Sequence, residues 1–335
     1  IEGDSGDTTT DIASQTVDSQ LAQGVNAIIG AASSGVSLTV IDKITSNGVV
    51  QFSPANTAPV LTTYEDNGLY FRNSPSDVLQ GAVIAAQAID AGVTNMAVIA
   101  RQDPYGEGLA IATVKDFTAA GGTITSDILY DPAAPSFEAE VAEIKAGAPD
   151  AVTVIGFEES VKLVQEMIKQ GVGPGDIQLY LVDGNLSTEA FKDFPKGTMK
   201  GTVGTVPSGS EDLTAFYDRM QAFDPALTDY SYGPQSYDAT MVIALAAQQA
   251  GCADGVAIAA ALGDVAGNGG EACSAYADCL ALIEAGTDID YMGVTGGVDF
   301  NEFGDLLEGT ISINEYTSNT EFGEIGSITA VVPLP

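Results

Sequence analysis

The stretch Gly30-Ala-Ala-Ser-Ser-Gly35, followed by Ser53-Pro-Ala-Asn-Thr-Ala-Pro59, indicates the fold of this chain. Each hydroxyl-rich stretch comes directly after a short apolar run, at residues 27–29 and 49–52, and the first also opens a predicted helix. Ligands of open α/β sheets bind in the crevice outside the carboxyl ends of the strands. Hydroxyls and free N–H groups at a helix N-terminus suit a small anion such as a carboxylate. We therefore expect an α/β protein that binds a small carboxylate-bearing molecule.

The composition is that of a globular and strongly acidic protein. The 335 residues are 45% hydrophobic and 17% charged, which is enough for two domains with their own cores. Lys and Arg number 11 against 46 Asp and Glu, which gives a formal net charge of −35. Nucleic acids and anionic membrane surfaces would repel such a chain, so neither is expected as a partner. We interpret the charge as a solvated acidic coat that aids solubility in salty surroundings.

Histidine is absent, which removes the commonest general base and the commonest metal ligand. The three cysteines are Cys252, Cys273 and Cys279, and the last two bracket a short loop. In an exported protein we predict a disulfide between Cys273 and Cys279, with pairings that use Cys252 as the alternative. Because the chain lacks both a C-x2-C motif and a histidine, we expect no zinc site, and we expect no other cofactor.

Predicted strands and helices alternate along the first two thirds of the chain. The predicted strands are apolar runs without alternation, as in parallel strands covered on both faces, at residues 27–29, 49–53, 96–100, 151–155 and 178–182. Helices with capping and stop signals are predicted between them, at residues 78–90, 137–146 and 158–170. This alternation indicates a doubly wound α/β fold.

Two β-rich segments, at residues 69–75 and 201–208, are predicted to cross between lobes. Further elements follow the second crossing. Helices are predicted at residues 212–223, 235–249, 256–262 and 275–285, and β-structure at 297–300, 311–316 and 327–332. We find no repeat at a fixed period.

Several motifs have competing interpretations. Ser33 lies in a degenerate nucleophile elbow, but the chain has no histidine to activate a serine. The phosphate-loop interpretation of residues 30–35 fails because Val36 stands where lysine is required. Residues 299–305 resemble the start of a calcium loop, yet Phe303 and Thr310 occupy ligand positions, so a polar hairpin turn is favoured.

Four strand ends carry polar side chains that could converge on a ligand. Ser34 could simply cap a helix, worth about 1 kcal/mol, and Thr57 could simply form a turn. Tyr105 follows the predicted strand at 96–100, and Asp183 follows the strand at 178–182. Together these ends offer hydroxyl, phenol and carboxylate groups, which favours a binding role over the simpler structural ones.

The chain resembles the type I periplasmic solute-binding proteins of ABC importers, in the branched-chain amino-acid (leucine/isoleucine/valine-binding) branch. The resemblance covers nearly the whole chain. The motifs that carry it are Ile29-Gly-Ala-Ala-Ser-Ser-Gly35, Phe52-Ser-Pro-Ala-Asn-Thr-Ala-Pro-Val-Leu-Thr62, Phe71-Arg-Asn-Ser-Pro-Ser-Asp77 with Gln80-Gly81, Tyr105-Gly-Glu-Gly-Leu-Ala110, Tyr237-Asp-Ala and Val298-Asp-Phe-x-x-x-Gly304.

The resemblance implies two Rossmann-like doubly wound lobes joined by three crossovers, with a ligand cleft between lobes that close by hinge motion. Residues 1–73 plus 207–308 are expected to form lobe 1, and residues 74–206 plus 309–335 lobe 2. The first strand and helix of the family are missing from the sequence as it begins at Ile1, so we expect it to be incomplete.

The resemblance also implies roles for individual residues. Ser34 and Thr57 would hold the α-carboxylate of an amino acid, and the carbonyl of Ala55, the hydroxyl of Thr57 and Asp183 would receive its ammonium. Tyr105 and Phe157 would close over the ligand from the second lobe. The expected set is completed by Ser33, beside Ser34, and by Tyr232, near the side-chain pocket.

The expected function is that of a non-enzymatic receptor that captures a small zwitterion, branched-chain or similar, and delivers it to an ABC permease. We expect a monomer that is periplasmic or extracellular, either free or held by a lipid anchor. Asp183 is shorter than the glutamate of leucine-type binders, and Ala32 stands where a bulkier residue would shape the pocket. The alternatives are therefore a short amide, urea or an aromatic acid as ligand, or a ligand-sensing regulatory module.

Overall fold

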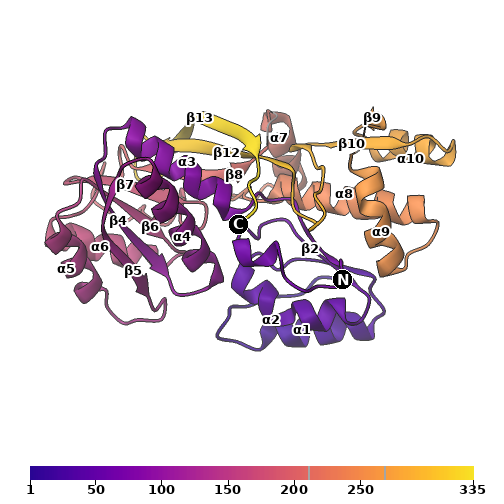
Figure 1. Ribbon diagram of the computed structural model, residues 1–335, viewed down its shortest axis with the longest axis horizontal. Coiled ribbons are helices and arrows are strands. Elements are labelled where there is room, and N and C mark those ends of the chain that lie inside the picture. The colour runs from indigo at the N-terminus through magenta and orange to yellow at the C-terminus, as the bar shows by residue number, and fades with distance from the viewer. Residues whose placement is uncertain (210–211, 268) are drawn as a thin grey trace. The chain divides into compact units, whose positions relative to one another are not determined.

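The computed structural model describes residues 1–209, 212–267 and 269–335, which form two compact units (Figure 1). Unit 1 comprises residues 1–76, 208–309 and 330–334. Unit 2 comprises residues 77–207 and 310–329, together with Pro335. Both units combine helices with parallel strands, and the α/β prediction is confirmed.

Unit 1 contains a parallel sheet in the order β1-β2-β3. Its strands are β1 (Ala27–Ile29), β2 (Val50–Ser53) and β3 (Tyr70–Arg72). Helices of this unit include α1 (Ile12–Ala22), α2 (Ser34–Thr45), α8 (Gly233–Ala250) and α9 (Gly255–Val265). Helix α1 packs on α2, and α8 packs on α9. The chain enters α2 directly after β1, so the first hydroxyl-rich stretch lies at a strand end and a helix start, as predicted.

Apolar side chains of unit 1 fill the space around this sheet. Val17 of α1, Val40 and Ile44 of α2 and Val49 form one buried cluster. On the other side, Phe52 and Phe71 stack with ring centroids 6.2 Å apart, and Phe300 packs edge-on against both.

A short helix η1 (Pro59–Leu61) and a small second sheet complete unit 1. The sheet has the order β11-β10-β9, with β9 (Glu271–Cys273), β10 (Ile289–Gly293) and β11 (Gly296–Gly297), and α10 (Tyr276–Glu284) precedes β10. Cys273 and Cys279 form a disulfide, and Cys252 is an exposed free thiol. The predicted pairing is therefore confirmed.

Unit 2 contains a seven-stranded sheet in the order β13-β12-β8-β7-β6-β4-β5. Each neighbouring pair within the series β8-β7-β6-β4-β5 is parallel. Their bounds are β4 (Asn95–Arg101), β5 (Thr123–Tyr130), β6 (Ala151–Ile155), β7 (Gln178–Val182) and β8 (Val203–Ser208). The two remaining strands are β12 (Glu308–Tyr316) and β13 (Phe322–Val331).

Helices cover both faces of the unit 2 sheet. On one face, side chains such as Val98 and Ile155 pack with Ile84 of α3 (Asp77–Asp90) and Leu109 of α4 (Pro104–Ala119). On the other face, alternating residues such as Val154 pack with α5 (Glu138–Gly147) and α6 (Ser160–Gln170). Burial on both faces explains why the strands appear in the sequence as continuous apolar runs.

Several predicted elements need correction at their ends. Helix α6 begins at Ser160 rather than 158, and α7 (Thr214–Phe223) begins after Asp212, whose carboxylate accepts from the Thr214 N–H. The β-structure predicted at 297–300 is limited to β11 and an isolated bridge between Phe300 and Leu306, because a tight turn follows. The sequence analysis did not predict α1, α4, β5, β9 or β10 as separate elements.

The C-terminal segment differs from the expected lobe assignment. Residues 330–334 belong to unit 1, whereas the expected second lobe included 309–335. The Val332 N–H donates to the carbonyl of Leu307, which attaches this segment to unit 1.

Within the described part of the chain, no single helix has the length and apolar character to cross a membrane, although α8 and α9, bent by 106°, meet that test as a pair.

Candidate functional site

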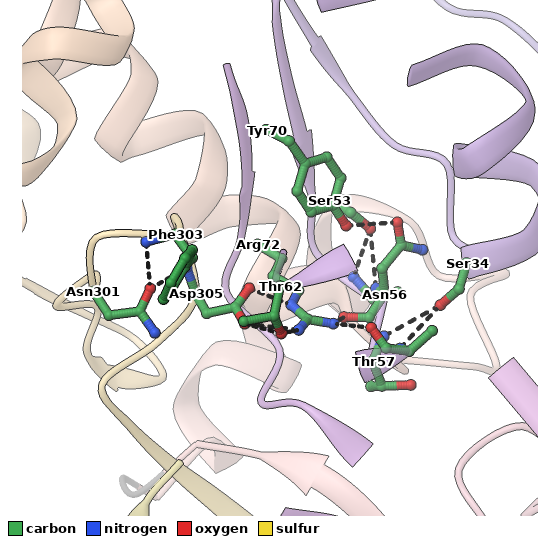
Figure 2. A network of polar contacts seen from close by, with 12 residues as sticks. Ser34, Ser53, Asn56, Thr57, Thr62, Tyr70, Arg72, Asn301, Phe303 and Asp305 are labelled. Carbon is green, nitrogen blue, oxygen red and sulfur yellow. Dashed lines mark hydrogen bonds and ion pairs between the residues drawn. The ribbon is translucent and has the colours of Figure 1, made fainter. Parts of the chain in front are cut away.

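In unit 1 the two hydroxyl-rich stretches are hydrogen bonded to each other. Ser53, the last residue of β2, accepts from the N–H groups of Ala55 and Asn56 and donates to the carbonyl of Ala31. The amide of Asn56 donates to the carbonyls of Ala31 and Ala32 at 3.1 and 2.8 Å, and its oxygen accepts from the Tyr70 hydroxyl. Residues 53–58, called here the 53–58 loop, therefore lie against the start of α2 (Figure 2).

Ser34 joins this loop to α2. Its hydroxyl oxygen accepts from the N–H groups of Thr57 and Ala58, each at 3.3 Å. The cap position of α2 is occupied by Ser33, without a side-chain cap bond, so the interpretation of Ser34 as a simple helix cap is wrong. Ser34 and Thr57 are 2% and 1% exposed. Since a hydroxyl that accepts two bonds keeps its proton for donation, Ser34 can still donate to an anion.

The remaining unit 1 residues of the expected set lie in different surroundings. Ala55 is buried in the same 53–58 loop. Ser33 is half-buried beside Ser34. Tyr232 is half-buried directly before α8 and has φ +56°, a left-handed conformation that is uncommon for a residue with a side chain.

Arg72, at the end of β3, is a residue of this region that the sequence analysis did not single out. It is fully buried and pairs with Asp305 through two contacts, Nε–Oδ1 at 2.6 Å and Nη2–Oδ2 at 2.8 Å. Its Nη1 donates to the carbonyls of Ala58 at 2.9 Å and Asn56 at 3.4 Å (Figure 2). Asp305 belongs to the turn at 299–305, and its carboxylate is the partner of the Arg72 guanidinium.

In unit 2 the structure brings Tyr105, Phe157 and Asp183 together. Asp183 follows β7, and its Oδ1 accepts from the Tyr105 hydroxyl at 3.0 Å and from Nε2 of Gln80 at 2.9 Å. The rings of Tyr105 and Phe157 are stacked, with centroids 5.3 Å apart and 7° between their planes. Gln80 appeared in the sequence analysis only within a motif, because a buried glutamine on an apolar helix face gives no signal of its partner.

Arg101, at the end of β4, supports this aromatic pair. Its guanidinium lies 4.0 Å from the centroid of the Phe157 ring, which is the distance of a cation–π contact. It also pairs with Asp103 at 2.6 Å and with Glu159 at 2.9 Å. Oε1 of Glu159 accepts from the Phe157 N–H and from the Tyr130 hydroxyl. Burial, and then the nearby Glu159 carboxylate, raise the pKa of Tyr130, which therefore stays a neutral donor.

Asp238, a further buried carboxylate, accepts hydrogen bonds from several neighbours. It accepts from the Tyr291 hydroxyl, from the N–H groups of Val294 and Thr295 and from the Thr295 hydroxyl. Burial raises its pKa, and the four hydrogen bonds oppose that shift.

Across residues 1–209, 212–267 and 269–335, no group of three or more Cys, Asp or Glu side chains has the arrangement to hold a metal ion.

The fold and these polar strand ends define a class of ligand-binding α/β proteins. The model of the receptor family ligand binding region matches residues 5–319, so the chain belongs to that family. The Leu/Ile/Val-binding protein homolog 1 of Brucella abortus is 30% identical over 249 residues, which are 72% of this chain and 64% of that protein. BasB of Halobacterium salinarum, a substrate-binding protein of a chemotactic signal transduction system, is 28% identical over 282 residues, 82% of this chain and 65% of that one.

Solved structures share the fold. A leucine-binding protein of Thermotoga maritima aligns with a TM-score of 0.78 at 20% identity and covers 96% of this chain and 85% of that one. A solute-binding protein of R. palustris in complex with benzoate aligns with a TM-score of 0.77 at 16% identity and covers 100% and 86%. The resemblance to type I periplasmic binding proteins of the branched-chain amino-acid branch is thus confirmed. The chain spans less than two thirds of the length of both curated relatives, 64% and 65%.

Proposed function

We propose that this chain is the ligand-binding part of an extracytoplasmic receptor that captures a small amino acid for an ABC permease. The ligand is a zwitterion with a branched or similarly small apolar side chain. The receptor acts as a monomer without catalysis, and its two lobes close over the ligand. The Brucella relative, named for leucine, isoleucine and valine binding, supports this ligand class.

The observation that carries the proposal is the pair of opposite chemistries at the two sets of strand ends. In unit 1, the Ser34 hydroxyl lies in the first turn of α2, where donors and the helix dipole suit a carboxylate, and the Thr57 N–H donates to it. In unit 2, the Asp183 carboxylate is held by two neutral donors beside a stacked aromatic pair. A carboxylate that faces an ammonium in a dry site forms a strong, charge-assisted bond.

Ala55, Phe157 and Tyr232 are assigned to the rest of the ligand. The carbonyl of Ala55 would accept from the ammonium, and Ser33 would add a second hydroxyl near the carboxylate. Phe157 would cover the apolar part of the ligand, because its stacking on Tyr105 and the Arg101 guanidinium beneath it fix the ring. Tyr232 would border the side-chain pocket.

A sensing role is a second candidate for the same binding chemistry. BasB, which covers most of this chain, is named as a substrate-binding protein of a chemotactic system, so the loaded receptor could address a transducer instead of a permease. Aromatic acids are a second ligand class, because a neighbour of the same fold was solved with benzoate. Benzoate has no ammonium group to pair with the Asp183 carboxylate, whereas an amino acid has one.

The test is thermal unfolding of the protein in the presence of single compounds: the twenty amino acids, urea, acetamide and benzoate. A ligand present at about 100 times its dissociation constant stabilises the folded state by about 2.7 kcal/mol and raises the melting temperature. We expect upward shifts with leucine, isoleucine or valine. D-leucine is the matched control, since it has the same composition with the opposite arrangement around the α-carbon.

Two analogues of leucine test separately how the receptor recognises the carboxylate and the ammonium of the ligand. Leucinamide lacks the carboxylate and 4-methylpentanoate lacks the ammonium, so both should give smaller shifts than L-leucine. Shifts with benzoate but with none of the amino acids would overturn the amino-acid proposal in favour of an aromatic acid. Absence of a shift with every compound would overturn the proposed ligand class altogether.

A further inference from the structure

We propose that Arg72 and Asp305 are positioning residues for the ligand carboxylate: their buried ion pair fixes the backbone on both sides of Thr57. This inference rests on the proposed function, in which Thr57 and Ser34 receive the carboxylate. Arg72 belongs to β3 and Asp305 to a turn near the C-terminus, 233 positions later in the chain. Both residues would thus contribute to ligand binding without contacting the ligand.

The guanidinium of Arg72 contacts the loop and the carboxylate at the same time. Nη1 donates to the carbonyls of Asn56 and Ala58, which are the two neighbours of Thr57 in the chain. Nε and Nη2 face the Asp305 carboxylate. Figure 2 shows this arrangement, with Arg72 between the 53–58 loop on one side and Asp305 on the other.

Two N–H groups of the same loop are held by a different partner. Thr57 and Ala58 donate their N–H groups to the Ser34 hydroxyl. The loop is therefore held through its carbonyls by Arg72 and through its amides by Ser34. Because Ser34 accepts both amides, a shift of the loop would also turn the Ser34 hydroxyl, which is the other proposed carboxylate donor.

The ion pair depends on both partners because it is buried. Arg72 is 0% exposed and Asp305 2% exposed, so either charge alone would be uncompensated in the interior. Thr62 adds a neutral bridge: its hydroxyl accepts from Nη2 of Arg72 at 2.9 Å and donates to Oδ2 of Asp305 at 2.7 Å. Lysine could not replace this arrangement, since its single ammonium lacks the planar fork that reaches several acceptors at once.

The turn that carries Asp305 is itself ordered. The Asn301 side chain accepts from the N–H groups of Phe303 and Asp305, and the carbonyl of Gly304 accepts from the Arg72 N–H. Gly304 has φ +78°, and a Cβ there would come within 2.4 Å of the Tyr70 carbonyl oxygen, so glycine is required. The turn and β3 are thus in direct backbone contact, which sets the position of the carboxylate relative to Arg72.

The experiment compares Arg72→Lys, Thr62→Val and a control, Thr113→Val, by calorimetric titration with L-leucine below the melting temperature of each variant. Thr113 is a fully buried threonine of unit 2 whose hydroxyl has no hydrogen-bond partner among the described residues. We expect leucine affinity to fall by about 10-fold in Arg72→Lys and about 3-fold in Thr62→Val, and to stay unchanged in the control.

A double-mutant cycle separates positioning from general destabilisation. In a Thr57→Val background the Arg72→Lys effect should shrink to less than about 3-fold, because the residue through which it acts has lost its hydroxyl. If Arg72→Lys weakens leucine binding by the same factor in both backgrounds, or leaves it at the wild-type value in both, the inference is wrong. Should Arg72→Lys fail to fold, Thr62→Val decides by the same comparison.

Hydrogen exchange gives a readout that needs no ligand. The amides of residues 55–58 should exchange about 10-fold faster in Arg72→Lys than in the wild type, while peptides from β6 should not change. If the wild type binds no amino acid, the proposed function fails, and the exchange rates still test whether the ion pair holds the loop. Wild-type exchange rates in Arg72→Lys would contradict the positioning role.

Discussion

Two buried arginines, one in each unit, support different kinds of binding surface. Arg72 in unit 1 holds backbone carbonyls, so the groups that it positions are the peptide units and hydroxyls of a loop. Arg101 in unit 2 lies against an aromatic ring and pairs with two carboxylates, so it positions side chains. In the proposed function, the unit 1 loop receives the ligand carboxylate through peptide units and hydroxyls, and unit 2 offers the Asp183 side chain to the ammonium.

The difference extends to how each arginine is neutralised. Arg72 is paired with Asp305, which comes from a distant part of the chain. Arg101 is paired with Asp103, two residues away, and with Glu159 at the start of α6. Asp103 also caps α4 by accepting from the Gly106 N–H, and a Cβ at Gly106 would come within 2.2 Å of the Arg101 carbonyl oxygen. In unit 2 one of the two carboxylates is thus local in sequence and the other, Glu159, is 58 positions away, whereas the carboxylate partner of Arg72 in unit 1 is 233 positions away.

The largest expected effect comes from removing either arginine charge. Arg72→Met and Arg101→Met each leave buried carboxylates without a cation, which should lower the free energy of unfolding by about 3–5 kcal/mol. The loss should be greater for Arg101→Met, because two carboxylates lose their partner rather than one. Urea unfolding followed by circular dichroism measures both.

Lys192→Met is the control for these arginine variants. It removes an ion pair whose two side chains are 56% and 64% exposed, and exposed pairs contribute little to stability. If the free energy of unfolding changes as little in Arg72→Met and Arg101→Met as in this control, neither buried pair contributes to stability. The comparison between the two arginines would then be wrong.

The next largest effect is expected on leucine affinity when a side chain of the proposed unit 2 site, Asp183, is changed. Asp183→Asn keeps an oxygen for Tyr105 and Gln80 but removes the negative charge, so a ligand ammonium would lose its partner. We expect the free energy of leucine binding to weaken by about 2–5 kcal/mol, measured by calorimetric titration.

Two measurements accompany Asp183→Asn. Asp193→Asn, at an exposed position of the same unit, removes the same charge and should leave leucine affinity unchanged. Binding of 4-methylpentanoate, which lacks the ammonium, should not weaken in Asp183→Asn. Equal losses for leucine and for this analogue would assign Asp183 a structural role instead.

The smallest expected effect is that of salt on the melting temperature, which should act on the acidic surface and not on the buried ion pairs. With a net charge of −35, repulsion between surface carboxylates opposes folding. Salt screens this repulsion between charges farther apart than the Debye length, which is about 10 Å at 0.1 M and about 3 Å at 1 M. The melting temperature should therefore rise by a few degrees between 0.1 and 1 M NaCl. The difference between wild type and Arg72→Met should stay the same, since that pair is shielded from salt. A melting temperature independent of NaCl would contradict the interpretation of the coat.

The amino-acid sequence was most informative where a short local pattern is typical of a single structure, such as a strand or a disulfide. Three strands, Ala27–Ile29, Ala151–Ile155 and Gln178–Val182, have the predicted bounds. The last two are buried, and a strand buried on both faces requires a continuous apolar run; the first is partly exposed, so its predicted burial is wrong. The Cys273–Cys279 pairing followed from a short spacing. Strands of mixed polarity, such as Thr123–Tyr130 at the edge of the sheet, gave no comparable signal.

The sequence alone therefore determined the α/β class, the family and the polar strand ends that carry Ser34, Thr57, Tyr105 and Asp183. Only the tertiary structure decided what surrounds them. Ser34 accepts amides of the 53–58 loop instead of capping α2, and Asp305 of the 299–305 turn pairs with Arg72. The physical reason is that local patterns record the burial and turn preferences of neighbouring residues. The partner of a buried charge is chosen by chain segments that meet only after folding.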